Sequence, residues 1–404
     1  MKPTVLSSSH RGLWALFAAG AIAIGATACD STEAPAASTP VPEIDMSTLD
    51  PGGFPTRPRE FGTVQTIDQA RIVEATRLAE HLPLPAEIDP GFNYSNQSMG
   101  RILLGPEQLG RLIAVDNFDK DAAGFISGFL SEGETKPDHA GLHFMNAVLI
   151  FPDAARAAGA AAALENSDYL YNNRNQRVAI PGYPEAHAHW EPGVQSIGSW
   201  FASGNLVIYT WVYDYVKTWL KKDDLPALLG LVQKSLDVVV PALEKFEPTP
   251  ADKLMQLQAD PDGMMKRVLP RSEGNPLVNP PAVFTANGAL HLAELPLDRK
   301  QLFTELGVDR YVEGDALLWR ARDAGAADRL MDDVSELDKK YRSIDPPKGL
   351  PIAKCKEYIG RDRYVPRYYC TVKYDRYVAQ TWSLQLTDIH QLISAQYSLL
   401  VNAQ

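Results

Sequence analysis

The sequence predicts an α+β fold with two related domains, each an antiparallel sheet with helices packed on one face. The first observation is that one order of elements, strand, helix, hairpin and helix, occurs in each half of the 404-residue chain. The second is that about 375 residues remain after the first 28 are set aside, a length typical of two domains. A proline-rich stretch then divides an N-terminal domain, 51–247, from a C-terminal domain, 248–404.

Each element follows from a local pattern. Apolar residues at helical spacing predict helices, and short apolar or alternating runs bounded by turn residues predict strands. In the first half the expected elements are helices over 69–82 and 106–113, a strand over 147–151, a helix over 152–165, a hairpin of 197–202 with 206–215, and a helix over 223–243. In the second half they are a strand over 316–321, a helix over 324–340, a hairpin of 368–373 with 377–384, and a helix over 387–400.

The N-terminus has the pattern of an export signal that ends at a cysteine. Lys2 and Arg11 precede an uncharged stretch of small and apolar residues, 13–28, which is shorter than a membrane span. This pattern resembles a bacterial lipoprotein signal, in which Cys29 becomes the new N-terminus and carries acyl chains such as palmitate. Residues 1–28 are therefore expected to be a signal peptide. The Ser, Thr, Pro and Ala-rich residues 29–50 are expected to be a flexible tether to the outer face of the cell membrane.

The charge balance and the other cysteines agree with that location. The formal net charge is −11, which disfavours nucleic acid as a partner. Cys355 and Cys370 remain as a pair, and in an oxidising compartment they are expected to form a disulfide. Two buried thiols are the alternative, and no CxxC or neighbouring histidine pair favours zinc at these cysteines.

Motifs of catalysis and cofactor binding are missing from the sequence. It contains no HExxH, CxxC, GxGxxG, Walker A loop, GxSxG or SxxK. Ser196 comes nearest to a nucleophile elbow, but the spacing is one residue too long and a strand follows. Asp260 and Asp262 lack the further acidic ligands that a calcium loop needs. We therefore expect no enzymatic activity and no cofactor.

Four histidines form two closely spaced pairs. His139 and His143 are four residues apart, and His187 and His189 are two apart on an extended segment. Either pair could face a metal ion. Nothing in the sequence brings the pairs together, so we expect surface or hydrogen-bonded histidines and no metal.

An aromatic stripe is the best candidate for ligand binding. Alternate residues of one strand, Tyr209, Trp211, Tyr213 and Tyr215, point to the same face of the predicted sheet. A groove that stacks a sugar or holds an acyl chain is one interpretation. Burial of both faces under helices and the other half of the protein is the alternative.

A basic segment stands out in this acidic chain. Residues 354–376 carry seven Lys and Arg side chains against three acidic ones, with tyrosines between them. This segment could meet an anionic envelope polymer or a lipid headgroup, or it could be a solvated hairpin.

Several separated motifs resemble an uncharacterised family of actinobacterial lipoproteins, a domain of unknown function with N-terminal and C-terminal parts. These motifs are residues 49–56 (LDPGGFPT), 74–79 (EATRLA), 148–155 (VLIFPDAA) and 248–250 (PTP). The resemblance implies an envelope location and a two-part fold, but it does not imply any particular reaction. The repeated pattern also resembles, weakly, the extracellular sensor domains of actinobacterial serine/threonine kinases.

These observations predict a membrane-anchored extracytoplasmic lipoprotein that acts without catalysis as a binding or accessory protein of the cell envelope. An envelope lipid or glycan is the expected kind of ligand. A hydrolase acting on envelope lipid, glycan or peptide remains an alternative, and so does a structural or protein-interaction role.

Overall fold

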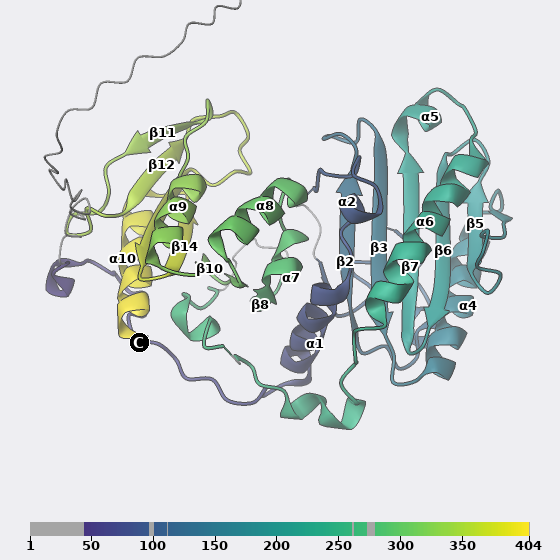
Figure 1. Ribbon diagram of the computed structural model, residues 1–404, viewed down its shortest axis with the longest axis horizontal. Helices are drawn as coiled ribbons and strands as arrows, with labels where there is room; N and C mark the ends of the chain where they lie inside the picture. The colour runs from purple at the N-terminus through teal and green to yellow at the C-terminus, as the bar shows by residue number, and fades with distance from the viewer. Residues whose placement is uncertain (1–43, 97–100, 111, 261, 273–278, 404) are drawn as a thin grey trace, which may run out of the picture. The chain divides into compact units, whose positions relative to one another are not determined.

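Two antiparallel sheets of seven strands carry the fold of the computed structural model (Figure 1), which describes residues 44–404 except 97–100, 111, 261, 273–278 and 404. The first sheet contains β1 (Ile102–Leu103), β2 (Ser127–Glu134), β3 (Leu142–Ile150), β4 (Gln176–Arg177), β5 (His187–Glu191), β6 (Ser196–Ser203) and β7 (Leu206–Asp214). The second contains β8 (Ala282–Thr285), β9 (Arg310–Glu313), β10 (Ala316–Arg320), β11 (Tyr341–Ile344), β12 (Lys354–Tyr358), β13 (Tyr368–Tyr374) and β14 (Tyr377–Ser383).

The two sheets have the same strand order. It is β1-β2-β3-β7-β6-β5-β4 in the first sheet and β8-β9-β10-β14-β13-β12-β11 in the second. Both central hairpins close on a two-residue turn, where Gly204 and Asp375 have φ values of 57° and 50°. Positive φ is typical of the tight turns that match strand twist. The α+β class and the two related domains are thus confirmed.

Helices connect the strands, and several begin at a side chain that accepts a backbone hydrogen bond. Thr66, Asp153, Asp224 and Asp323 cap α1, α4, α6 and α9, respectively. The α-helices are α1 (Ile67–His81), α2 (Pro85–Ile88), α3 (Phe118–Asp121), α4 (Ala154–Tyr171), α5 (Tyr215–Trp219), α6 (Leu225–Leu243), α7 (Ala286–Leu290), α8 (Pro296–Leu306), α9 (Ala324–Val334) and α10 (Leu386–Asn402). The 3₁₀ helices are η1 (Met46–Thr48), η2 (Ala251–Gln256) and η3 (Met265–Arg267).

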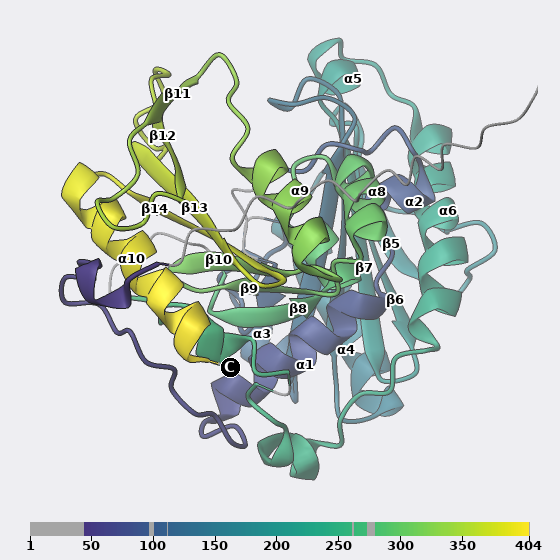
Figure 2. The same cartoon turned by 60° about the vertical axis from the view of Figure 1, so that its left-hand side comes forward.

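Helices cover both faces of each sheet, whereas the sequence predicted one covered face. In the first sheet Ala147 packs in the cluster under α4, and Val148 packs in the cluster under α6. In the second sheet Val378 packs in the cluster under α9, and Ala379 packs in the cluster under α10. Figure 2 shows these two helices on opposite sides of β14. Uninterrupted apolar runs such as that at 147–151 are typical of strands buried on both faces.

Helix α1 joins the two halves, because it contacts β2 of the first sheet and both β8 and α7 of the second. Beside it, the buried His291 lies with its Nδ1 2.8 Å from Ser131 Oγ. Its Nε2 lies 3.2 Å and 3.1 Å from the carbonyl oxygens of Ala79 and Leu82. Burial lowers the pKa of His291 to about 4, so the ring is neutral near pH 7.

Three other segments differ from the sequence prediction. Residues 106–110 and 112–113 form hydrogen-bonded turns where a helix was expected, and α9 ends at Val334. The predicted tether was to extend to residue 50, yet Ile44, Met46 and Leu49 pack against the core of the second sheet. The predicted signal peptide, Cys29 and the rest of the tether lie outside the described residues.

Among the described helices, α6 alone is long and apolar enough to cross a membrane by length and composition. It is also the main helix on one face of the first sheet. Its buried side chains recur at intervals of three or four residues, as in a helix that packs one side on a core. They are Leu228, Val232, Ser235, Leu236, Val239 and Leu243.

Candidate functional site: an apolar cavity with arginines at its edge

A cavity of about 570 Å³ lies between α1, residues 257–265 and β8. Helix α1 contributes the residues that recur at intervals of one, three or four along one side: Gln69, Ile72, Val73, Thr76, Arg77 and Glu80. The opposite wall comes from the second domain and includes Ala282, Phe284 and Met265. A volume of this size between domains, with mostly apolar walls, is typical of sites for small molecules.

Three arginines contribute the positive charge of this cavity. Arg77 donates to the buried Glu74 at 2.6 Å, and Arg310 donates to Asp262 at 2.6 Å. Arg59 is exposed and forms no ion pair within the described part of the chain. Its guanidinium instead lies 4.6 Å from the centre of the Phe61 ring. Arg59 is therefore the lining cation that is free to bind a ligand anion.

A second cavity of about 320 Å³ continues from the first, since Arg59, Phe61, Met265 and Pro281 line both. It adds the positively charged side chains of Arg57, Lys266 and Arg271, and none of its described lining residues is acidic. The two cavities together thus change from apolar to cationic along their length.

A buried carboxylate fixes α1 at the cavity wall. Glu74 is fully buried and accepts hydrogen bonds from the backbone N and the Oγ1 of Thr249 at 2.7 Å and 2.8 Å. These contacts, with the hydrogen bond that Arg77 donates to the carbonyl oxygen of Glu247 at 3.2 Å, tie α1 to the proline-rich segment that follows the first domain. Charge-assisted hydrogen bonds of this kind are stronger than neutral ones and hold the wall in place.

The aromatic stripe does not line this cavity. Tyr209 is buried beneath α4, 4.6 Å from the ring of Trp200, and burial raises its pKa well above the usual value. Trp211 and Tyr213 are half-buried, and Tyr215 begins α5. Only the outer end of the stripe is therefore accessible, beside the hairpin that carries His143.

The two histidine pairs lie at different places in the first sheet. His143 is on β3 and His187 and His189 are on β5, with β7 and β6 between them, so about 14 Å separates their strands. His139 and His143 do meet, because their rings stack with centres 5.5 Å apart.

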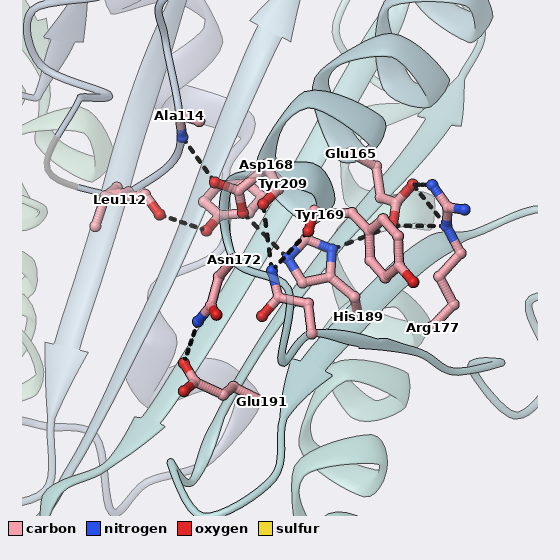
Figure 3. A network of polar contacts seen from close by, with 11 residues as sticks. Leu112, Ala114, Glu165, Asp168, Tyr169, Asn172, Arg177, His189, Glu191 and Tyr209 are labelled. Atoms are coloured by element: carbon pink, nitrogen blue, oxygen red, sulfur yellow. Dashed lines mark hydrogen bonds and ion pairs between the residues drawn. The ribbon is translucent and has the colours of Figure 1, made fainter.

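Buried His189 connects β5 to α4 (Figure 3). Its Nδ1 lies 3.1 Å from Glu165 Oε1, and its Nε2 lies 3.2 Å from Asp168 Oδ2. Arg177 donates to the same Glu165. Burial disfavours the charged imidazole, but the hydrogen bonds to Asp168 and Glu165 outweigh it and raise the pKa of His189. The network therefore holds a strand and a helix together.

The basic segment uses much of its charge internally. Lys354 pairs with Asp332, and Lys373 pairs with Asp328. Arg367 lies 2.8 Å from Glu357. These pairs leave less free charge for an external anion than the sequence indicated.

The predicted disulfide is confirmed. Cys355 and Cys370 are directly opposite each other on β12 and β13, with Cα atoms 4.1 Å apart. The bond joins two neighbouring strands near the edge of the second sheet.

The cavity and its cationic edge were missed by the sequence analysis. Their residues come from 55–80, 257–285 and 310–314, with one residue of α10, and no short motif joins these segments. The one local signal is on α1, where the apolar Ile72 and Val73 are only partly buried although they pack against the main core.

The fold and the cavity define a two-domain α+β protein with a ligand-sized cavity between elements of both domains. The chain belongs to the family described as "Domain of unknown function (DUF7373)". The N-terminal part of that family matches residues 61–259 and the C-terminal part matches residues 264–403. The predicted two-part family of unknown function is therefore confirmed.

The other comparisons add little. No curated protein matches the sequence. Among solved structures, the chain is similar to the extracellular domain of PknH from Mycobacterium tuberculosis, with 13% identity and a TM-score of 0.28. That match covers 46% of this chain and 100% of the PknH domain.

Proposed function

We propose that this protein is an extracytoplasmic lipoprotein, anchored to the cell membrane through Cys29, that binds an amphipathic anion without catalysis. The apolar part of the ligand occupies the larger cavity, and its anionic group lies at Arg57 and Arg59. An envelope lipid has this combination of properties. The anchor is supported by the signal pattern before Cys29, and an oxidising location is supported by the Cys355–Cys370 disulfide.

The continuity of an apolar cavity with a cationic one is the observation that carries this proposal. Each buried methylene group contributes about 0.8 kcal/mol, so a chain of about ten methylenes gains on the order of 8 kcal/mol before the cost of association. An anion that pairs with Arg59 adds a charge-assisted hydrogen bond and fixes the direction in which the ligand enters.

Fluorescence titration with 1-anilinonaphthalene-8-sulfonate, which joins aromatic rings to a sulfonate, tests the proposal. Its uncharged counterpart is N-phenyl-1-naphthylamine. Arg59→Glu is expected to weaken binding of the sulfonate roughly tenfold, because it removes a charge-assisted contact, and to leave the uncharged probe unaffected. Val73→Trp, which fills the apolar cavity, is expected to weaken both probes.

Arg361→Glu is the matched control, since Arg361 is exposed and lies in the loop between β12 and β13. Arg361→Glu makes the same change of charge at a residue that does not line either cavity, so it should leave the affinities for both probes unchanged. Equal loss of sulfonate binding in both charge variants would show a general effect of net charge. Unchanged binding in Val73→Trp would place the probe elsewhere, and either result would overturn the proposal.

A further inference from the structure

The hairpin of β2 and β3 brings together three side chains of the kind that bind transition metals. Glu134 is the last residue of β2, His139 lies in the connecting loop, and His143 lies near the start of β3, directly opposite Glu134. One ligand atom from each lies within 4.8 Å of the other two. His139 Nδ1 is 2.9 Å from Glu134 Oε1, and His143 Nδ1 is 3.9 Å from the same oxygen.

Two atoms of this cluster are buried and lack a hydrogen bond. Within the described chain, His143 Nδ1 has no hydrogen-bond partner, and Glu134 Oε1 has the 2.9 Å contact with His139 Nδ1 but no hydrogen bond of normal geometry, although both side chains are at least nine-tenths buried. Buried polar atoms are nearly always satisfied, so the unpartnered His143 Nδ1, 3.9 Å from a buried carboxylate oxygen, indicates a missing partner between the two. A cation satisfies both at once, because each atom offers a lone pair.

The surroundings of His143 fit this interpretation. Its other ring nitrogen, Nε2, lies 3.3 Å from Glu132 Oε2, and Arg101 donates to Glu132 at 2.6 Å. A carboxylate on the far nitrogen orients a metal-binding histidine and leaves Nδ1 facing the ion.

The backbone also positions the third side chain. Asp138 and His139 have φ values of 58° and 55°, a region that residues with a Cβ seldom adopt. This turn brings the His139 ring onto Tyr215, with ring centres 4.9 Å apart. Its backbone N donates to Glu134 Oε2 at 3.2 Å, which leaves Oε1 of that carboxylate facing the rings. Unfavourable backbone conformations of this kind cluster at ligand sites.

We propose that Glu134, His139 and His143 bind a divalent transition-metal ion, with Zn²⁺ as the best match to two imidazoles and a carboxylate. Around tetrahedral zinc, ligand atoms lie about 3.3 Å apart, so the cluster must contract by about 1.5 Å at its widest separation. The half-exposed His139, in a loop, can supply that movement. Three protein ligands leave a coordination position for water or a small anion. The Tyr215 ring lies beside both imidazoles, with its centre 4.9 Å from that of His139 and 6.4 Å from that of His143.

Metal binding by the full-length protein in detergent tests the proposal. After removal of metal with a chelator, the protein is titrated with Zn²⁺ against a competing indicator, and the bound metal is counted by elemental mass spectrometry. We expect one Zn²⁺ per chain in the wild type. The loss of a direct ligand in His139→Ala or Glu134→Gln should weaken binding more than about 100-fold, and Glu132→Gln should weaken it about 10-fold to 100-fold.

His187→Ala is the matched control, because His187 is exposed on β5 of the same sheet. It should bind Zn²⁺ as the wild type does. Cobalt absorbance gives a second readout, since a tetrahedral site with nitrogen and oxygen ligands has visible bands that should vanish in His139→Ala. A wild type without stoichiometric Zn²⁺, or a His139→Ala variant that binds it equally well, would overturn the proposal. So would an equal loss in His187→Ala. Because Arg59 and Val73 lie outside this hairpin, none of these results bears on the cavity.

Discussion

Two buried histidines show how surroundings decide the charge of a residue. His291 faces a hydroxyl and two carbonyl oxygens, and burial lowers its pKa to about 4. His189 lies between the carboxylates of Glu165 and Asp168, which raise its pKa despite burial. The sequence identified His189 as part of a pair but gave no sign of its partners, because His189 lies on β5 whereas Glu165 and Asp168 lie on α4. Both histidines are structural, and they affect stability in opposite directions as pH changes.

His291 is expected to make the protein less stable in mild acid. Between pH 6.5 and 4 the unfolded chain takes up a proton at this histidine and the folded chain does not, so stability falls as pH decreases through this window. At pH 4.5 the loss amounts to roughly 2–3 kcal/mol relative to pH 7. His291→Gln lacks this titration, so its urea unfolding midpoint should fall less over the same range. His189 has the opposite sign, since its stabilisation is complete below pH 6.5 and is lost as pH rises through the raised pKa.

Comparing the unfolding midpoints of His291→Gln and the wild type at each pH removes the contribution of carboxylate titration, which is common to both proteins. The same decrease in unfolding midpoint in His291→Gln and the wild type would contradict a neutral, buried His291.

At the scale of elements, the central hairpins and long helices could be predicted because their patterns are local. The apolar runs at 147–151 and 206–214 and the capped helices α4 and α6 need no distant partner to be recognised. Strand β2 could not be predicted, because its sequence SGFLSEGE carries two glycines and two glutamates and is nevertheless wholly buried. Arg101, outside the strand, compensates the charge of Glu132. The short edge strands and the covered second faces depend likewise on contacts between distant segments.

The disulfide between β12 and β13 is expected to stabilise the second domain. It links residues 15 apart in sequence, for which the loss of chain entropy in the unfolded state corresponds to about 3 kcal/mol. The Cys355→Ala/Cys370→Ala variant should therefore unfold in urea at a clearly lower concentration than the wild type, as followed by circular dichroism. Reduction of the wild type should reproduce the change. An unaltered midpoint would contradict this expectation and show that strand pairing alone holds β12 and β13 in register.

At the scale of the whole molecule, one topology occurs twice, and the candidate site lies where elements of the two copies approach. The repeat could be predicted from the order of elements in each half. The cavity could not, because α1 precedes the first sheet and β8 begins the second, and their approach is not encoded in any short window. Arg59 likewise gains its significance only from Phe61, Met265 and Pro281 around it. The order of elements therefore follows from local patterns, whereas the cavity follows from contacts between segments far apart in sequence.

Native mass spectrometry of the full-length protein, extracted gently from its own membranes, tests the central claim most directly. The protein is compared with Val73→Trp, and denaturation releases any bound molecule for identification. We predict a wild-type chain acylated at Cys29 that carries one amphipathic anion, and a variant that is acylated equally but carries none. An acylated wild type without a bound molecule, or equal occupancy in Val73→Trp, would contradict ligand binding in the cavity. An unacylated Cys29 would contradict the membrane anchor.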